Sequence, residues 1–242
     1  MIPRKITSLQ HPLVKRLVKI RLDKEARQQE KSVLVVGLKM VEELSPVKTL
    51  IIDRPYPQLS GRQVFEATPE ILKKITGLSS PEGVAAEVDL PSDADLSSAH
   101  YLLVLDGVSD PGNVGTLLRT ALALGWEGVF LTPGSADPFN EKALRAAKGA
   151  TFRLPLCHGT VEELKAMWKG KFYVADLQGS APAAATPPLA LILGSEAHGP
   201  SQELKKIATS VSIPMPGSME SLNVAIAGGI LMYILSPPKG GK

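Results

Sequence analysis

The chain has 242 residues, of which 44% are hydrophobic, and a net charge of +3. This composition provides enough apolar material for one large domain or two modest ones. No apolar run reaches the roughly 20 residues that span a bilayer, and the first residues lack the apolar stretch of a signal peptide. A single cysteine, Cys157, excludes an internal disulfide, and no second Cys or His pair accompanies Cys157 and His158 at metal-ligand spacing. We therefore expect a cytoplasmic protein without a membrane segment or a metal site.

The first 27 residues are strongly basic. They hold eight Lys or Arg residues against two acidic ones, so the rest of the chain is slightly acidic. Apolar residues recur at helical spacing from Leu13 to Leu22, which predicts a helix over residues 11–27 with Ser8 as its cap. A basic helix face suits the phosphates of a polyanion, although a solvated face without a partner explains the same pattern. The candidate phosphate contacts are Lys15, Arg16 and Lys19.

Strand and helix patterns alternate in the part of the chain that follows. Strands are predicted at residues 33–36, 48–52, 63–67 and 83–88, with helices at 38–44 and 69–75. The next stretch, residues 90–98, is polar and turn-prone, and we place the domain linker there. The sequence therefore predicts a small α/β domain over residues 1–90 and a second domain over residues 98–242.

The second domain opens with an uninterrupted apolar run at residues 101–105, which is typical of a strand inside a parallel sheet. Its other elements alternate in the same way. Further strands are expected at residues 129–131, 172–175, 189–193 and 211–213, and helices near 113–124, 141–149, 161–168, 201–207 and 221–235. This pattern predicts an open, mostly parallel α/β sheet whose ligand lies beyond the carboxyl ends of the strands.

A first polar motif follows the opening strand. Residues 106–112 form a glycine- and proline-rich turn, after which Asn113 is a plausible N-cap of the next helix. Arg119 lies six residues further along, so a shared site requires its side chain to reach back along the helix. A capped helix with a solvent-exposed Arg119 accounts for the spacing equally well. No Gly-Lys-Ser or Gly-Lys-Thr follows the glycines, so this is not a Walker P-loop.

Two more motifs follow later strands. The strand at 189–193 leads into Gly194 and Glu196, and such a carboxylate either caps a helix or faces a ligand. The prolines of segment 213–217 require the chain to leave the sheet there. Ser221 is then expected to cap a helix that is apolar nearly all round, and therefore buried in a core or a subunit interface. The small residues Gly228 and Gly229 in this helix would allow another helix to approach closely.

Together the segments Asn113–Arg119, Leu193–Gly199 and Ile213–Asn223 resemble the three signature motifs of the SpoU-type RNA ribose 2′-O-methyltransferases of the SPOUT superfamily. The resemblance extends over residues 101–235. Residues 5–90 resemble the small α/β substrate-binding domain that often precedes it. Ala197 stands where the family commonly has glycine, and Val36 stands where the leading domain often has glutamate.

The resemblance implies a homodimer whose C-terminal segment forms a deep trefoil knot that holds S-adenosylmethionine. The backbones of Gly194, Ile213 and Leu222 would bind this cofactor, beside Leu193, with Met215 lining the adenine pocket. The polar set of the family corresponds here to Asn113, Arg119, Glu196, Ser221 and Asn223. In this set we assign Arg119 to orientation of the 2′-hydroxyl and its 3′-phosphate, because a guanidinium does not lose its proton.

The function implied is methylation of a ribose 2′-hydroxyl, with 23S ribosomal RNA as the expected substrate because of the leading domain. Three alternatives remain open: methylation of transfer RNA, methylation of a base nitrogen, and a non-catalytic RNA-binding protein on the same fold. The sequence does not identify the nucleotide.

Overall fold

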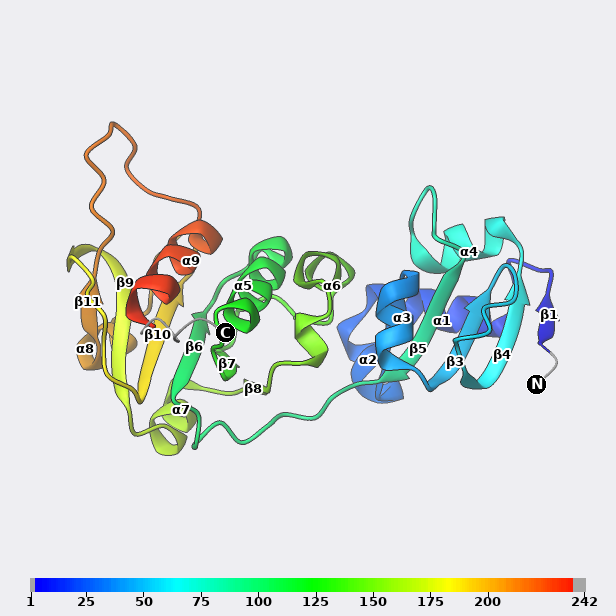
Figure 1. Cartoon of the computed structure of the whole chain (residues 1–242), viewed down its shortest axis with the longest axis horizontal. Coiled ribbons are helices and arrows are strands. Elements are labelled where there is room, and N and C mark those ends of the chain that lie inside the picture. Colours follow the sequence, from blue (N-terminus) through cyan, green and yellow to red (C-terminus); the bar gives the residue numbers. More distant parts are fainter. Residues whose placement is uncertain (1–2, 237–242) are drawn as a thin grey trace. The chain divides into compact units, whose positions relative to one another are not determined.

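The structure is a computed structural model that describes residues 3–236. These residues form two compact units, and the main boundary between them lies between Pro91 and Ser92 (Figure 1). None of the helices in the described part has the length and apolarity needed to cross a membrane.

The first unit is a five-stranded mixed sheet with four helices. The strand order is β1-β4-β3-β5-β2, and β5 runs antiparallel to both of its neighbours. Apolar residues of α1 and α4 enter the same core cluster as the sheet, and the two helices are in contact. The elements are β1 (Arg4–Ile6), α1 (Pro12–Leu22), α2 (Lys24–Glu30), β2 (Ser32–Val36), α3 (Leu38–Leu44), β3 (Val47–Ile52), β4 (Gly61–Ala67), α4 (Pro69–Thr76) and β5 (Val84–Asp89).

The basic leading segment differs from the single helix that the sequence predicts. The chain is extended at Asp23, which ends α1 and caps α2 by accepting the backbone N–H of Glu25 at 2.8 Å. At the other end of α1, His11 accepts the N–H of Leu13, so Ser8 is not the cap. The short carboxylate of Asp23 favours the N-cap position, so a new helix begins there. The segment that the sequence predicts as one helix is therefore divided into α1 and α2.

The second unit contains a six-stranded sheet in which every pairing is parallel, in the order β11-β9-β10-β6-β7-β8. The predicted parallel α/β sheet is confirmed, although the three-residue strand β8 is too short to be recognised from its sequence. The elements are β6 (Tyr101–Asp106), α5 (Pro111–Ala123), β7 (Gly128–Leu131), α6 (Glu141–Ala147), η1 (Ala150–Phe152), β8 (Leu156–His158), α7 (Val161–Met167), β9 (Lys171–Ser180), β10 (Leu189–Gly194), α8 (Gln202–Ile207), β11 (Thr209–Val211) and α9 (Val224–Leu235).

Strands β6 and β10 lie at the centre of this sheet, and all their residues are buried. After β6 the chain crosses to β7, on one side of this central pair of strands. After β10 it crosses to β11, on the other side of the pair. The loops that follow β6 and β10 therefore diverge, which is where parallel sheets bind their ligands.

Helix α9 packs closely on α5 and on the central strand β10. A side chain at Gly228 would come within 2.5 Å of both Leu117 in α5 and Leu193 in β10. The expected close helix approach is therefore confirmed at Gly228, and its partner is α5. This contact brings the beginning of α9 to the same edge of the sheet as the beginning of α5.

Candidate active site

Three side chains from the three sequence motifs form one hydrogen-bonded chain. The Asn113 Nδ2 donates to Glu196 Oε1 at 2.9 Å, and Asn223 Nδ2 donates to Asn113 Oδ1 at 3.1 Å. Asn113 lies in the first turn of α5, Glu196 follows β10, and Asn223 directly precedes α9. Segments up to 110 residues apart in the chain therefore meet in one polar cluster.

Glu196 is held by donors from both the helix and the preceding loop. Besides Asn113, the backbone N–H of Ser109 donates to its second oxygen at 3.3 Å. Partial burial raises the pKa of Glu196, but the hydrogen bonds from Asn113 and from backbone N–H groups outweigh this, so the net pKa is lowered. Glu196 is thus an ionised acceptor that fixes loops, and it holds a loop amide and Asn113 rather than Arg119.

The helix caps are not those predicted from the sequence. Asp110 caps α5 by accepting the N–H of Asn113 at 2.8 Å, and Asn223 caps α9 by accepting the N–H of Ala225 at 2.9 Å. The expected caps, Asn113 and Ser221, are therefore wrong. Because Asp110 already serves the helix end, the Asn113 side chain remains available for the polar cluster.

A tight loop closes over the end of β10. A side chain at Gly194 would collide with the backbone of Gly199 and Pro200, so only glycine fits there. Gly199 has a φ of +68°, which favours glycine, and its N–H donates to Ser195 O at 2.8 Å. The Gly194 backbone therefore lies directly beneath the loop that carries Glu196, while Ala197 at the tip of that loop is exposed.

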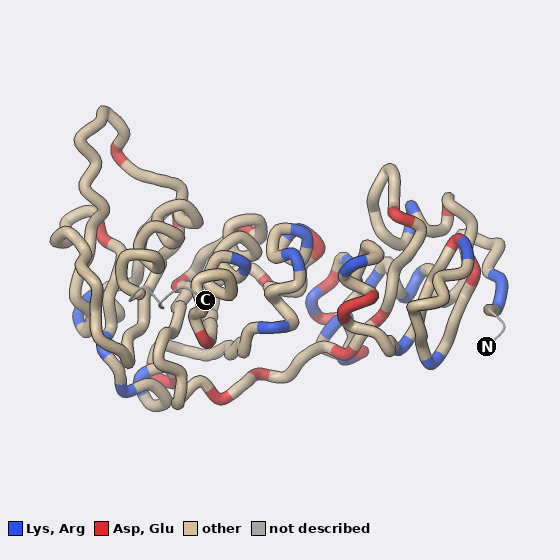
Figure 2. Tube along the Cα trace, viewed as in Figure 1, with Lys and Arg blue, Asp and Glu red and all other residues tan. Residues whose placement is uncertain are grey.

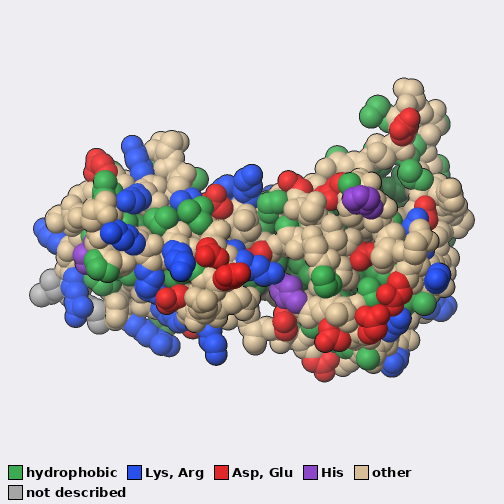
Figure 3. All heavy atoms as spheres, turned by 180° about the vertical axis from the view of Figure 1, so that it is seen from behind, with side chains coloured by type: hydrophobic (Ala, Val, Ile, Leu, Met, Phe, Trp, Pro, Cys, Tyr) green, Lys and Arg blue, Asp and Glu red, His purple; other side chains and the backbone are tan. Residues whose placement is uncertain are grey.

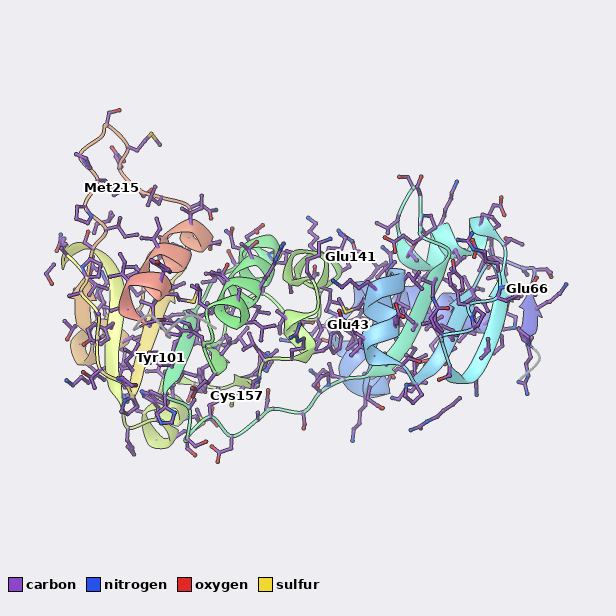
Figure 4. The ribbon with its side chains drawn as sticks, in the orientation of Figure 1. Glu43, Glu66, Tyr101, Glu141, Cys157 and Met215 are labelled. Carbon is purple, nitrogen blue, oxygen red and sulfur yellow. The ribbon has the colours of Figure 1, made fainter. Side chains whose placement is uncertain are left out.

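The remaining cofactor candidates lie around the segment between β11 and α9, which follows a long path away from the sheet (Figure 1). Leu193 is fully buried, Ile213 and Met215 are half-buried, and Leu222 is exposed. Figure 4 shows Met215 on this segment. Ser221 is exposed as well, and no hydrogen bond joins it to the polar cluster among residues 3–236.

Arg119 lies on α5 with an exposed side chain. Within the described part of the chain it forms no hydrogen bond or ion pair, so its guanidinium is available to a ligand. Residues 3–236 also contain no group of three His, Cys, Asp or Glu side chains arranged to hold a metal ion.

The three RNA candidates on α1 have different surroundings. Lys15 and Lys19 are exposed, and Figures 2 and 3 show many Lys and Arg residues in the first unit. The Arg16 guanidinium instead donates to both carboxylate oxygens of Glu87, at 2.9 and 2.6 Å, and to Glu30 at 3.1 Å. Glu87 is only 3% exposed and also accepts the Thr49 hydroxyl at 2.8 Å. Arg16 therefore neutralises a buried carboxylate and fastens α1 to the sheet.

Sequence reasoning missed a second carboxylate at this edge of the sheet. Asp106, the last residue of β6, is buried and accepts hydrogen bonds from Thr132 Oγ1 at 3.0 Å and from the backbone N–H of Ser201 at 2.6 Å. A carboxylate directly after the apolar run 101–105 is the sequence feature that could have identified it as a site residue. Nothing in the sequence identifies its two partners.

Known proteins resemble this chain over nearly its whole length. A model of the family described as SpoU rRNA Methylase matches residues 100–233. The 23S rRNA (guanosine(2553)-2'-O)-methyltransferase RlmP of Bacillus subtilis (strain 168) is 36% identical, covering 96% of this chain and 99% of that protein. The 23S rRNA (guanosine-2'-O-)-methyltransferase RlmB of Yersinia pestis is 32% identical, over 64% of this chain and 67% of its own length.

Solved structures have the same fold. The AdoMet-bound rRNA methyltransferase from Sinorhizobium meliloti matches with a TM-score of 0.84 and 29% identity, covering 95% of this chain and 96% of that one. The SpoU methyltransferase AviRb from Streptomyces viridochromogenes has a TM-score of 0.80 and 26% identity, with 91% and 95% covered. The family model spans more than half of the sequence, and the matched residues include all three segments that meet in the polar cluster. The chain therefore belongs to the SpoU rRNA methylase family.

Proposed function

We propose that this chain transfers the methyl group of S-adenosylmethionine to a ribose 2′-hydroxyl of 23S ribosomal RNA. The observation that carries this proposal is the hydrogen-bonded chain Asn223–Asn113–Glu196, which joins the three motifs at the carboxyl ends of β6 and β10. The Bacillus relative, which acts on the 2′-oxygen of a 23S rRNA guanosine, aligns over nearly the whole chain.

The residues around β10 fit the cofactor. Gly194 offers backbone groups that no side chain of its own covers, while Ile213, Met215 and Leu222 supply apolar surface and Leu193 supports Gly194 from within the core. Apolar walls with a few backbone hydrogen-bonding groups are typical of an adenine site. S-adenosylmethionine, when bound, supplies an electrophilic methyl group on a sulfonium.

Arg119 is proposed to orient the RNA for this reaction. Its exposed guanidinium presents several donors in one plane, which suits a hydroxyl and a phosphate together. Positive charge beside the 2′-hydroxyl lowers the pKa of that hydroxyl, and the neighbouring 3′-phosphate is the proposed proton acceptor. Asn113, Glu196 and Asn223 hold the surrounding loops, and Ser221 orients the segment before α9.

The first unit is proposed to bind the RNA substrate, with Lys15 and Lys19 of α1 meeting phosphates. Arg16 is committed to Glu87, so we assign it to stability of the RNA-binding helix rather than to a phosphate. Action on ribosomal RNA is consistent with a cytoplasmic location.

A homodimer with a knotted C-terminal segment completes the proposal. Helix α9 follows the edge strand β11 yet packs on β10 and α5, as a threaded end requires. Its outer face carries an apolar stripe of Ile226, Ile230 and Tyr233, which are 57%, 36% and 73% exposed. A second copy of the chain would cover this stripe.

Mapping of ribose methylation in cells tests the substrate. We expect deletion of the gene to remove one 2′-O-methyl group from 23S rRNA, with the guanosine equivalent to that of the Bacillus relative as the first candidate. Loss of a ribose methyl group from transfer RNA would redirect the proposal to that substrate. Loss of a base methyl group, or no loss at all, would contradict ribose methylation.

A further inference from the structure

Asp106 is a buried carboxylate with no cation beside it. It is 9% exposed, and no Lys, Arg or His side chain within residues 3–236 forms an ion pair with it. Its two oxygens are instead held by neutral donors, the Thr132 hydroxyl at 3.0 Å and the Ser201 backbone N–H at 2.6 Å. An unpaired buried charge is costly, so its presence at the edge of the central strands requires an explanation.

Asp106 lies beside both ends of the loop that covers β10. In the sheet, Asp106 lies directly opposite Gly194, the residue at which this loop begins. Pro200 has no backbone N–H, and the next residue, Ser201, donates its N–H to Asp106. The backbone of Asp106 therefore lies beside the start of the loop through strand pairing, and its carboxylate holds the end of the loop through a hydrogen bond.

We propose that Asp106 is a positioning residue that closes the loop 195–200 on Gly194 and so forms the cofactor-binding surface. This inference rests on the proposed function, because Gly194 is assigned to the cofactor there. The same loop carries Glu196, so its closure also places the partner of Asn113. Thr132, the residue after β7, steadies the carboxylate, whereas Ser201 is the group on which loop closure depends.

The chemistry of the two donors explains why this position holds aspartate. A hydroxyl and a backbone N–H both require an acceptor, and an ionised carboxylate accepts on both oxygens. An asparagine can still accept the Ser201 N–H with its carbonyl oxygen, while its amide donates to Thr132 Oγ1. Asp106→Asn therefore keeps the loop contact and removes the charge, whereas Asp106→Ala removes the contact itself.

Binding of S-adenosylmethionine and of S-adenosylhomocysteine, measured by calorimetry without RNA, tests the inference. Asp106→Ala is expected to weaken both ligands by on the order of 10-fold, as expected when a hydrogen bond to a charged group is lost. Asp106→Asn is expected to remain within about threefold of the wild type. Hydrogen exchange at the Ser201 amide should be slow in the wild type and in Asp106→Asn but fast in Asp106→Ala.

A second variant breaks the same contact from the loop side. Ser201 has a φ of −61°, which proline adopts, and its buried hydroxyl has no hydrogen-bond partner in the described part of the chain. Ser201→Pro deletes the N–H and leaves the Asp106 charge in place, and we expect the same loss of affinity as in Asp106→Ala. Thr151→Val is the control, because the Thr151 hydroxyl is likewise buried in this unit and has no hydrogen-bond partner among residues 3–236.

The outcomes separate this inference from the proposed function. If the folded wild type binds neither ligand, the proposed function fails. If the wild type binds and Asp106→Ala or Ser201→Pro binds equally well, the positioning role of Asp106 is overturned. A loss as large in Asp106→Asn, with its Ser201 amide still protected, would also overturn it, because the charge rather than the loop contact would then be the cause.

Discussion

The two units hold carboxylates in different ways. In the first unit, Glu87 lies within a strand and is paired with the Arg16 guanidinium at 2.6 Å. In the second unit, Asp106 and Glu196 lie at strand ends, where hydroxyl, amide and backbone N–H groups hold them. The ion-paired Glu87 fastens a helix to a sheet, whereas Asp106 and Glu196, which have no cation beside them in the described residues, hold the loops of the candidate site. We therefore expect carboxylates with neutral partners at parallel strand ends to serve the site, and the salt bridge to serve stability.

The largest effect is expected at Arg119, an exposed cation on α5, the helix that carries Asn113 of the polar cluster. Arg119→Ala should lower the single-turnover methylation rate by about 100-fold or more, because a positioned electrostatic group is lost from the transition state. Its affinity for S-adenosylmethionine should stay near that of the wild type. Arg119→Lys should recover little of the rate, because an ammonium does not reproduce the planar donors. Wild-type rates in both variants would leave Arg119 as a solvent-facing helix residue.

Breaking the paired carboxylate should affect stability rather than chemistry. Arg16→Ala leaves Glu87 buried with the Thr49 hydroxyl and should lower the free energy of unfolding by about 2–3 kcal/mol at neutral pH. Denaturant unfolding measures this change. Methylation of RNA at a temperature where the variant is folded should be nearly unchanged. A large rate loss in a folded Arg16→Ala variant would instead support direct contact of Arg16 with RNA.

The pH dependence of the same pair has a defined sign. Burial raises the pKa of Glu87, but the hydrogen bonds from Arg16 and Thr49 lower it by more than burial raises it. The pKa of Glu87 in the folded protein is therefore depressed. A depressed carboxyl pKa contributes stability above the ordinary pKa of the group, and this is lost as the pH falls through the lowered value. The stability difference between wild type and Arg16→Ala should therefore shrink on acidification below the ordinary carboxyl range. A constant difference down to strongly acidic pH would contradict this assignment.

A smaller effect is expected when Glu196, in the loop after β10, is neutralised. Glu196→Gln keeps one acceptor for Asn113 and should lower the methylation rate by about 10-fold, whereas Glu196→Ala should lower it further. A double-mutant cycle with Asn113→Ala measures their coupling. Additive losses would show that the 2.9 Å contact between them does not matter for the reaction.

The smallest effect concerns the exposed lysines of the first unit. Replacing Lys15 and Lys19 by Gln should flatten the salt dependence of RNA binding by up to about two phosphate contacts. Lys165→Gln is a matched control, because Lys165 is ion-paired with Glu203 in the second unit. An unchanged slope would identify the basic face of α1 as a solvated surface.

The architecture was more predictable than the contacts. Long apolar runs such as β6 and β10 identify a parallel sheet, because buried central strands have no polar face. The three motifs identified Asn113, Glu196 and Asn223, which the structure joins. The short strands β1 and β8 have too few residues for a pattern. Glu87 lies 71 residues from Arg16 and Ser201 lies 95 residues from Asp106, and single-chain periodicity contains no information on such distant pairs.

The most direct test of the central claim is the chemical position of the transferred methyl group. The purified wild-type protein is incubated with methyl-labelled S-adenosylmethionine and unmodified 23S rRNA, and the product is hydrolysed with alkali. A ribose 2′-O-methyl group blocks cleavage of the adjacent phosphodiester, so the account predicts that the label appears in an alkali-resistant dinucleotide. Label in free mononucleotides would show base methylation, and no label despite measured cofactor binding and RNA binding would show a non-catalytic protein; either result contradicts the account.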